Sequence, residues 1–192
     1  MDTHVIAAEV VAELGADSAR VLRLSELCVR LERPLPQIAP ACELLRDCGV
    51  ISTGDGEAAL LASRQGRSDS RIVLIAENSA AVAHVLAALL EGEGYAVLIA
   101  RTLGLAVGVL RATSVDLVIA DSFAPTAGTA LERLAELRDL ARPAPVLLFT
   151  GHRDVPETAA RAAGYAGMLP KPFDIDELLA RVGAAIEGRT TA

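Results

Sequence analysis

Four consecutive apolar side chains stand between two carboxylates near the middle of the sequence, in Asp116-Leu117-Val118-Ile119-Ala120-Asp121. The run is continuous rather than alternating, which is typical of a strand in a parallel sheet that is covered on both faces. Four other short apolar runs share this character, at residues 72–76, 95–100, 146–149 and 167–169. The sequence therefore predicts five buried parallel strands between residues 71 and 188.

Helical patterns separate these runs. One of them places Val82, Val85, Leu86, Leu89 and Leu90 at offsets of 0, 3, 4, 7 and 8, on one face of a helix. Two similar stripes follow, one of Leu103, Ala106, Val107 and Leu110 and one of Ile175, Leu178, Leu179, Val182 and Ile186. Repeated alternation of strand and helix predicts an α/β fold, a five-stranded doubly wound parallel sheet with right-handed crossovers.

Polar side chains follow these strands where ligands bind in such sheets, at the carboxyl ends. Glu77 and Asn78 come after the first run, Asp121 ends the third, Thr150 ends the fourth, and Lys171 follows the fifth. Taken singly, each has an ordinary explanation as a cap, a strand-end hydroxyl or a solvated charge. Together they suit phosphoryl chemistry, because a carboxylate can be the nucleophile, oxygen ligands hold Mg²⁺, and a hydroxyl and an ammonium stabilise the transferred group.

The spacings of 44, 29 and 21 residues between Glu77, Asp121, Thr150 and Lys171 make residues 71–188 resemble the flavodoxin-like receiver domain of two-component response regulators. The resemblance implies that Asp121 is the phosphoacceptor, taking a phosphoryl group from a histidine of a sensor kinase or phosphotransfer protein. It also implies that Thr150 and Lys171 bind the phosphoryl oxygens and that the bond from Lys171 to Pro172 is cis. A receiver catalyses only its own phosphorylation, so we do not expect an enzyme in the ordinary sense.

Two positions depart from the family pattern. Asn78 stands where a second acidic metal ligand is usual, so the Mg²⁺ site of Glu77, Asn78 and Asp121 has one charge fewer and is expected to be weak. Met168 occupies the aromatic switch position three residues before Lys171, and Tyr165 is nearby but out of register. Two hypotheses stay open: an atypical receiver that is phosphorylated, and a pseudo-receiver scaffold that signals through protein contacts alone.

The N-terminal part has a different pattern, and the polar residues 63–70 separate it from the receiver-like part. We place a first domain at residues 1–65, a linker at 66–70 and the receiver at 71–192. Helical patterns at residues 3–14, 24–31 and 38–45 precede a hairpin pattern at residues 50–61 with a turn at Gly54-Asp55-Gly56. This order resembles a small winged helix-turn-helix (α+β) domain.

The resemblance to winged helices implies DNA binding through the second helix of the motif. In that helix, Gln37 and Arg46 are the exposed residues that can read base edges. Residues 1–70 nevertheless hold 7 basic and 11 acidic side chains, a net charge of −4, whereas phosphate contacts need cations. The charges favour a protein-binding or dimerising module, and DNA-binding transcription regulation and a homodimer stay open.

Composition excludes several classes of protein. The 192 residues carry a net charge of −7, which rules out a basic nucleic-acid coat. No apolar run approaches the roughly 20 residues of a membrane span, and no signal peptide is visible, so we expect a cytoplasmic protein. The three cysteines and three histidines fit no metal motif, and neither GxxxxGK[ST] nor GxGxxG follows a strand. Seventeen of the 18 basic residues are arginine, and the one lysine is Lys171.

Overall fold

The computed structural model describes residues 2–48, 50–61, 71–123, 130–151 and 156–190. The C-terminal part consists of β4 (Ile72–Ala76), α4 (Ala80–Gly92), β5 (Ala96–Ala100), α5 (Leu103–Ala112), β6 (Leu117–Asp121), α6 (Ala130–Arg133), α7 (Ala135–Ala141), β7 (Val146–Thr150), α8 (Glu157–Ala162), β8 (Gly167–Pro170) and α9 (Ile175–Thr190). The five strands form one parallel sheet in the order β5-β4-β6-β7-β8. The predicted five-stranded doubly wound sheet is confirmed.

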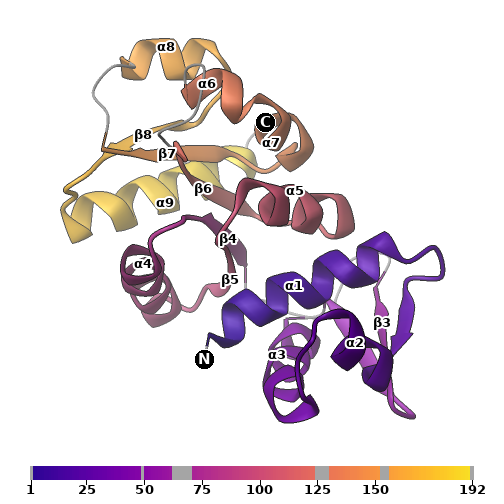
Figure 1. Cartoon of the computed structure of the whole chain (residues 1–192). Coiled ribbons are helices and arrows are strands. Elements are labelled where there is room, and N and C mark those ends of the chain that lie inside the picture. Colours follow the sequence, from indigo (N-terminus) through magenta and orange to yellow (C-terminus); the bar gives the residue numbers. More distant parts are fainter. Residues whose placement is uncertain (1, 49, 62–70, 124–129, 152–155, 191–192) are drawn as a thin grey trace.

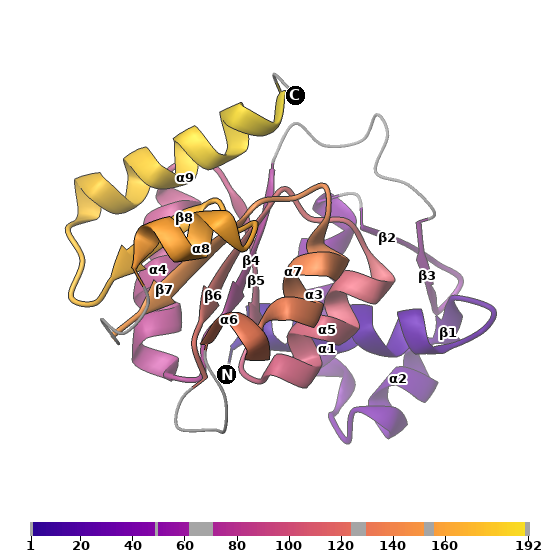
Figure 2. The same ribbon diagram turned by 90° about the horizontal axis from the view of Figure 1, so that it is seen from above.

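Helices cover both faces of this sheet (Figure 2). Successive residues of a strand belong to two separate buried clusters, one on each face. Val73 and Ile75 pack with α4 and α9, whereas Leu74 and Ala76 pack with α5 and α7 on the other side. Because every strand is covered twice, β4, β6 and β7 are buried at each position.

Two residues assigned to buried helical stripes are in fact exposed. Val85 on α4 is 53% exposed, and Ile175, the first residue of α9, is 50% exposed. The face of α4 that meets the sheet is centred on Ala83, Leu86, Ala87 and Leu90. The hydropathy pattern places Val85 on the apolar face of the helix. In the structure, the small alanines of α4 face the sheet instead and let the helix lie close to the strands.

The N-terminal part consists of α1 (Thr3–Ala16), β1 (Val21–Arg23), α2 (Leu24–Arg30), α3 (Leu35–Asp47), β2 (Ile51–Gly54) and β3 (Glu57–Leu60). Its strands form a three-stranded antiparallel sheet in the order β1-β3-β2. The three helices and the hairpin match the sequence prediction. Strand β1, which has only three residues, was not predicted. The predicted linker at residues 66–70 lies outside the described residues, so the domain boundaries stay a prediction.

Helix α1 joins the two parts, because it packs on α3 on one side and on α5 and β5 on the other (Figure 1). The approach to α5 is close: a Cβ placed on Gly15 would lie 2.3 Å from the Cβ of Ala112. The imidazole Nδ1 of His4 lies 3.0 Å from the carbonyl oxygen of Val97 on β5, the edge strand of the large sheet. Helix α1 therefore covers a sheet edge that is otherwise open to pairing with another chain.

One buried apolar cluster runs through this junction and includes Leu14 of α1, Leu45 of α3 and Val109 of α5. Cys42 lies in the same cluster, and burial raises the pKa of its thiol to about 11. Among the described helices, none is long and apolar enough to cross a membrane.

Candidate functional site

Four predicted site residues lie at the carboxyl ends of four neighbouring strands. Glu77 follows β4, Asp121 ends β6, Thr150 ends β7, and Lys171 follows β8. The backbone N–H of Lys171 donates to the carbonyl oxygen of Thr150 at 2.8 Å, which continues the strand pairing into the loop. Residues separated by up to 94 positions in the sequence are thereby brought to one edge of the sheet.

Lys171 bridges the two carboxylates. Its Nζ donates to Oε2 of Glu77 at 2.6 Å and to Oδ1 of Asp121 at 2.8 Å. Glu77, Asp121 and Thr150 are all buried, whereas Lys171 is partly exposed. The same ammonium lies 4.4 Å from the centroid of the Phe149 ring, which restricts it from one side. One cation thus stabilises two buried anions that would otherwise repel each other.

Backbone N–H groups bind the remaining carboxylate oxygens. The N–H of Ser79 donates to Oε1 of Glu77 at 2.7 Å, and that of Phe123 donates to Oδ2 of Asp121 at 2.9 Å. Phe123 reaches this position with a φ of +50°, a left-handed conformation that is uncommon for a bulky residue. Each oxygen of an ionised carboxylate has two lone pairs, so Asp121 can accept these hydrogen bonds and still attack an electrophile.

No side-chain pattern in the sequence predicts the roles of Ser79 and Phe123. Both act through their main-chain N–H groups, which are the same in any non-proline residue. A left-handed backbone is anticipated mainly for glycine or asparagine, so Phe123 was not singled out.

Asn78 is exposed beside this cluster, and its main-chain carbonyl oxygen accepts hydrogen bonds from Arg101 at the end of β5. The contact from Nε of Arg101 measures 3.1 Å. Arg101 was not predicted to belong to the site. Its guanidinium links the loop after β4 to the end of the neighbouring strand and brings positive charge to the main chain of Asn78, the position where the family usually has a second acidic residue.

Met168 and Tyr165 lie on the same side of the sheet as α7. Met168 is half-buried on β8, in register with Leu148. Tyr165 is buried, and its hydroxyl donates to the carbonyl oxygen of Leu131 on α6 at 3.0 Å. Burial raises the pKa of the Tyr165 phenol. The aromatic ring near β8 is therefore fixed against α6.

Comparison with known protein families decides the classification. Residues 73–183 match the model of the response regulator receiver domain, and this range contains the whole cluster just described. The chain belongs to the response regulator receiver family. The prediction of a receiver in the C-terminal part is confirmed, and the cis bond between Lys171 and Pro172 that the family implied is present.

Several known proteins resemble the receiver. The uncharacterized transcriptional regulatory protein YkoG of Bacillus subtilis is 33% identical over 120 residues, which cover 62% of this chain and 52% of YkoG. The KDP operon transcriptional regulatory protein KdpE of Escherichia coli is 35% identical over 116 residues, which cover 59% of this chain and 50% of KdpE. This chain therefore spans about half the length of the curated relatives that it matches.

Solved structures show the same fold. A CheY-like response regulator receiver domain protein from Methanospirillum hungatei superposes with a TM-score of 0.58 at 22% identity, covering 64% of this chain and 98% of that one. The signal receiver domain of an HD domain-containing protein from Pseudomonas fluorescens has a TM-score of 0.57 at 25% identity, covering 64% of this chain and 99% of that one.

Receiver domains bind Mg²⁺ at the acidic site, so the donor set of this receiver can be tested for its fit. Within the described part of the chain, no group of three or more Asp, Glu, His or Cys side chains could hold a metal ion. Glu77 and Asp121 supply two carboxylates, and the amide of Asn78 can add a neutral oxygen. Such a set fits Mg²⁺, which takes one or two carboxylates together with water and phosphate oxygens, but with less charge than three carboxylates.

The two residues proposed to read DNA lie far from the receiver site, on α3. Gln37 is half-buried in the first turn of this helix. Arg46 is exposed near its C-terminal end, where Nη2 lies 3.3 Å from Oδ1 of Asp47. The structure thus places them about two and a half helical turns apart, and the guanidinium of Arg46 already has an acidic partner.

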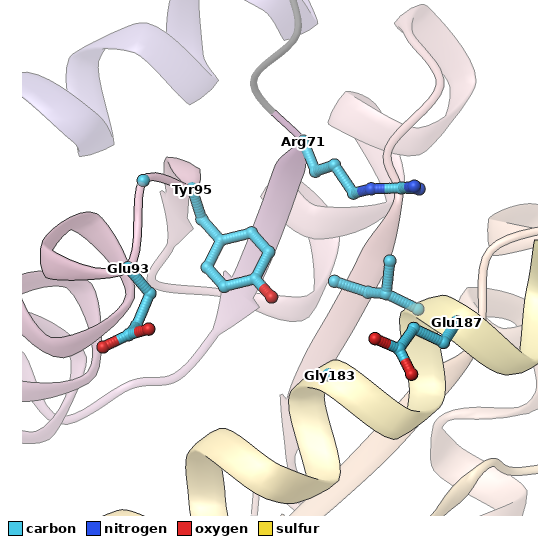
Figure 3. A pocket seen from close by; sticks show the side chains of 7 residues that line it. Arg71, Glu93, Tyr95, Gly183 and Glu187 are labelled. Atoms are coloured by element: carbon cyan, nitrogen blue, oxygen red, sulfur yellow. The ribbon is translucent and has the colours of Figure 1, made fainter.

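A pocket of about 270 Å³ lies at the opposite end of the sheet, where β4 and β5 begin. Arg71, Glu93, Tyr95 and Glu187 line it together with the last turns of α9 (Figure 3). None of the predicted site residues lines it.

Proposed function

We propose that this protein is an atypical response regulator that is phosphorylated on Asp121 and thereby controls an N-terminal output domain. The bridge from Lys171 to Glu77 and Asp121 carries the proposal, because it places a buried nucleophile, a second carboxylate and a fixed cation within one hydrogen-bond network. The family implies a cognate histidine kinase as the phosphoryl donor.

In the proposed reaction, an oxygen of Asp121 attacks the phosphorus atom of a phosphohistidine. The bond from phosphorus to the imidazole nitrogen breaks, and a bond from phosphorus to Asp121 forms. Lys171 shifts from the carboxylate to a phosphoryl oxygen, and the Thr150 hydroxyl donates to another. A Mg²⁺ ion held by Glu77, Asn78 and Asp121 would neutralise charge on the phosphoryl group. The protein catalyses only its own modification.

The N-terminal part is proposed to be the output domain, with a winged-helix fold. The order α1-β1-α2-α3-β2-β3 supports this proposal, because two short helices are followed by a hairpin, and β1 pairs with that hairpin. Relatives named as transcriptional regulators support a role in transcription control. Direct contact of this domain with α5 and β5 offers a short route from receiver to output.

A second candidate function is a pseudo-receiver scaffold that is never phosphorylated. The observation in its favour is the donor set itself, which lacks a carboxylate at Asn78 and an aromatic ring at Met168. In that case, the bridge of Lys171 is permanent and stabilises one conformation of the strand ends.

One experiment separates the two candidates. Beryllium fluoride, a mimic of the phosphoryl group, is added with millimolar Mg²⁺ while the amide resonances are followed by NMR. Phosphorylation predicts shifts around Asp121, Thr150 and Lys171 that disappear in Asp121→Asn, which keeps the size of the side chain but removes its nucleophilic oxygen. If the wild-type resonances do not move, the proposed phosphorylation is rejected and the scaffold stands.

A further inference from the structure

Four apolar residues on α2 and α3 are exposed. These helices lie on the side of α1 that faces away from the receiver (Figure 1). Val29 at the end of α2 is 77% exposed, and Leu35 at the start of α3 is 47% exposed. Pro36 and Pro40 are also exposed on α3. Exposed apolar residues that form a contiguous patch with a polar rim mark a site of association.

The arginine side chains of this domain form ion pairs or hydrogen bonds with other groups of the same chain. Arg33 forms a bidentate pair with Glu9, with its Nε 2.8 Å from Oε2. Arg30 pairs with Asp17 at 3.1 Å and Arg23 with Glu57 at 3.9 Å. Arg46 pairs with Asp47, and Arg20 reaches the carbonyl oxygen of Ala112. All five arginines of residues 2–61 therefore have partners inside the protein.

The rim of the apolar surface is acidic. Glu32 in the turn between the helices and Glu43 on α3 are both exposed. Four of the five arginines are paired with carboxylates of the chain and the fifth with a carbonyl oxygen, so DNA phosphates would meet the carboxylates of Glu32 and Glu43 here. Binding to DNA depends on releasing counterions through cations. An apolar centre with an anionic rim complements a ligand that has apolar side chains at its centre and cations beside them.

We propose that the surface formed by Val29, Glu32, Leu35, Pro36, Pro40 and Glu43 binds a protein segment that carries large apolar side chains flanked by lysine or arginine. This surface is called the α2–α3 surface below. The inference rests on the proposed function, because it names the partner class of the output domain. A second copy of the chain complements the surface poorly, since most of the other described arginines are held by acids or carbonyl groups, as in the pairs of Arg111 with Glu136 and Arg161 with Glu157.

The test uses the full chain and a displayed library of short random peptides. Selected peptides are expected to combine two or more large apolar residues with flanking lysine or arginine. Their affinity, measured by fluorescence polarisation, is expected to fall about tenfold or more in the double variant Val29→Asp, Leu35→Asp. It should fall also in Glu43→Arg, which keeps the apolar centre intact. Val85→Asp, at a similarly exposed valine on α4, is the matched control and should leave the affinity unchanged.

Four results would overturn the proposal. The first three are selected peptides without this composition or none at all, binding that survives both surface variants, and sedimentation showing a homodimer that the double variant abolishes. A fourth is binding of random-sequence duplex DNA at low salt that is lost in Arg46→Ala. Circular dichroism shows that each variant is folded. Beryllium fluoride binding at Asp121 in the double variant separates a failure of this surface from a failure of the receiver.

Discussion

Nζ of Lys171 lies 2.6 Å from Oε2 of Glu77, across 94 positions of sequence. The same nitrogen is 2.8 Å from Oδ1 of Asp121, so one compact ammonium serves both carboxylates. A guanidinium is planar and larger, and it cannot occupy the same point between two oxygens. This geometry gives a physical reason for the one lysine in a chain that otherwise uses arginine.

Lys171→Arg should therefore lower phosphorylation of Asp121 by acetyl phosphate, by on the order of a hundredfold, because the charge is kept but its position is lost. The rate is measured from the phosphorylated fraction over time on phosphate-affinity gels. Arg181→Lys, which exchanges the same two residue types in an ion pair with Glu177 on α9, is the control and should leave the rate unchanged. Equal rates in wild type and Lys171→Arg would refute the positional argument.

Asn78→Asp should raise the affinity for Mg²⁺ about tenfold, which is about 1.4 kcal/mol, since it adds a third carboxylate to the site. Calorimetric titration of Mg²⁺ into the full chain measures the change. Asn78→Ala removes the amide oxygen without adding charge, and we expect it to bind Mg²⁺ more weakly than wild type. If the three proteins have the same affinity, residue 78 does not contact the metal.

Gly15→Ala should destabilise the protein by about 1–3 kcal/mol, because the new methyl group would lie 2.3 Å from Cβ of Ala112. Adding Ala112→Gly in the same chain should recover part of the loss, as expected for residues in direct contact. Urea unfolding measures both. Gly183→Ala in α9, where a Cβ meets nothing within 4 Å, is the control and should be neutral or stabilising. A loss that Ala112→Gly does not reduce would place the strain elsewhere.

Glu157→Gln tests the ion-pair network that links α8 and α9. Hydrogen bonds from Arg161 and Arg181 lower the pKa of Glu157 below its ordinary value. A lowered pKa in the folded state means that the carboxylate stabilises the fold at neutral pH and that this stabilisation is lost as the pH falls through the lowered pKa. The variant should be less stable by up to about 1 kcal/mol at pH 7, because the pair is partly solvated.

The difference between Glu157→Gln and wild type should then shrink toward zero below about pH 4. Urea unfolding at several pH values measures it. Glu136→Gln, in an exposed pair with Arg111, is the control for an ion pair on the surface. A difference that stays constant from pH 7 to acid would show that the side chain acts by packing and not by charge.

The strands and the four site residues were predictable because of a property of parallel sheets. A continuous apolar run marks each strand, and the carboxyl ends of all strands meet at one edge, so Glu77, Asp121, Thr150 and Lys171 had to converge. The contacts of Arg101 with the carbonyl of Asn78 and of Phe123 with Asp121 were not predictable. They depend on loop conformation and main-chain groups, which side-chain patterns do not encode.

The surfaces on which α1 packs were also not predictable from the sequence. Its apolar residues predict a helix, but they do not say which of two neighbouring surfaces the helix covers, and it covers both. The exposure of Val85 has a related cause, because hydropathy ranks valine above alanine whereas close packing on a sheet favours the smaller side chain.

The close contact between Gly15 and Ala112 has a consequence for how such a protein can change over evolutionary time. A domain that is joined to its neighbour only by a flexible tether can be exchanged for another by recombination at the tether, with little loss of stability in either part. Here a recombinant that kept only the receiver would leave the outer side of α5 bare and the β5 edge open. Any replacement for the first 61 residues must bring a helix that fits the same surface, so the two parts are constrained to diverge as a pair.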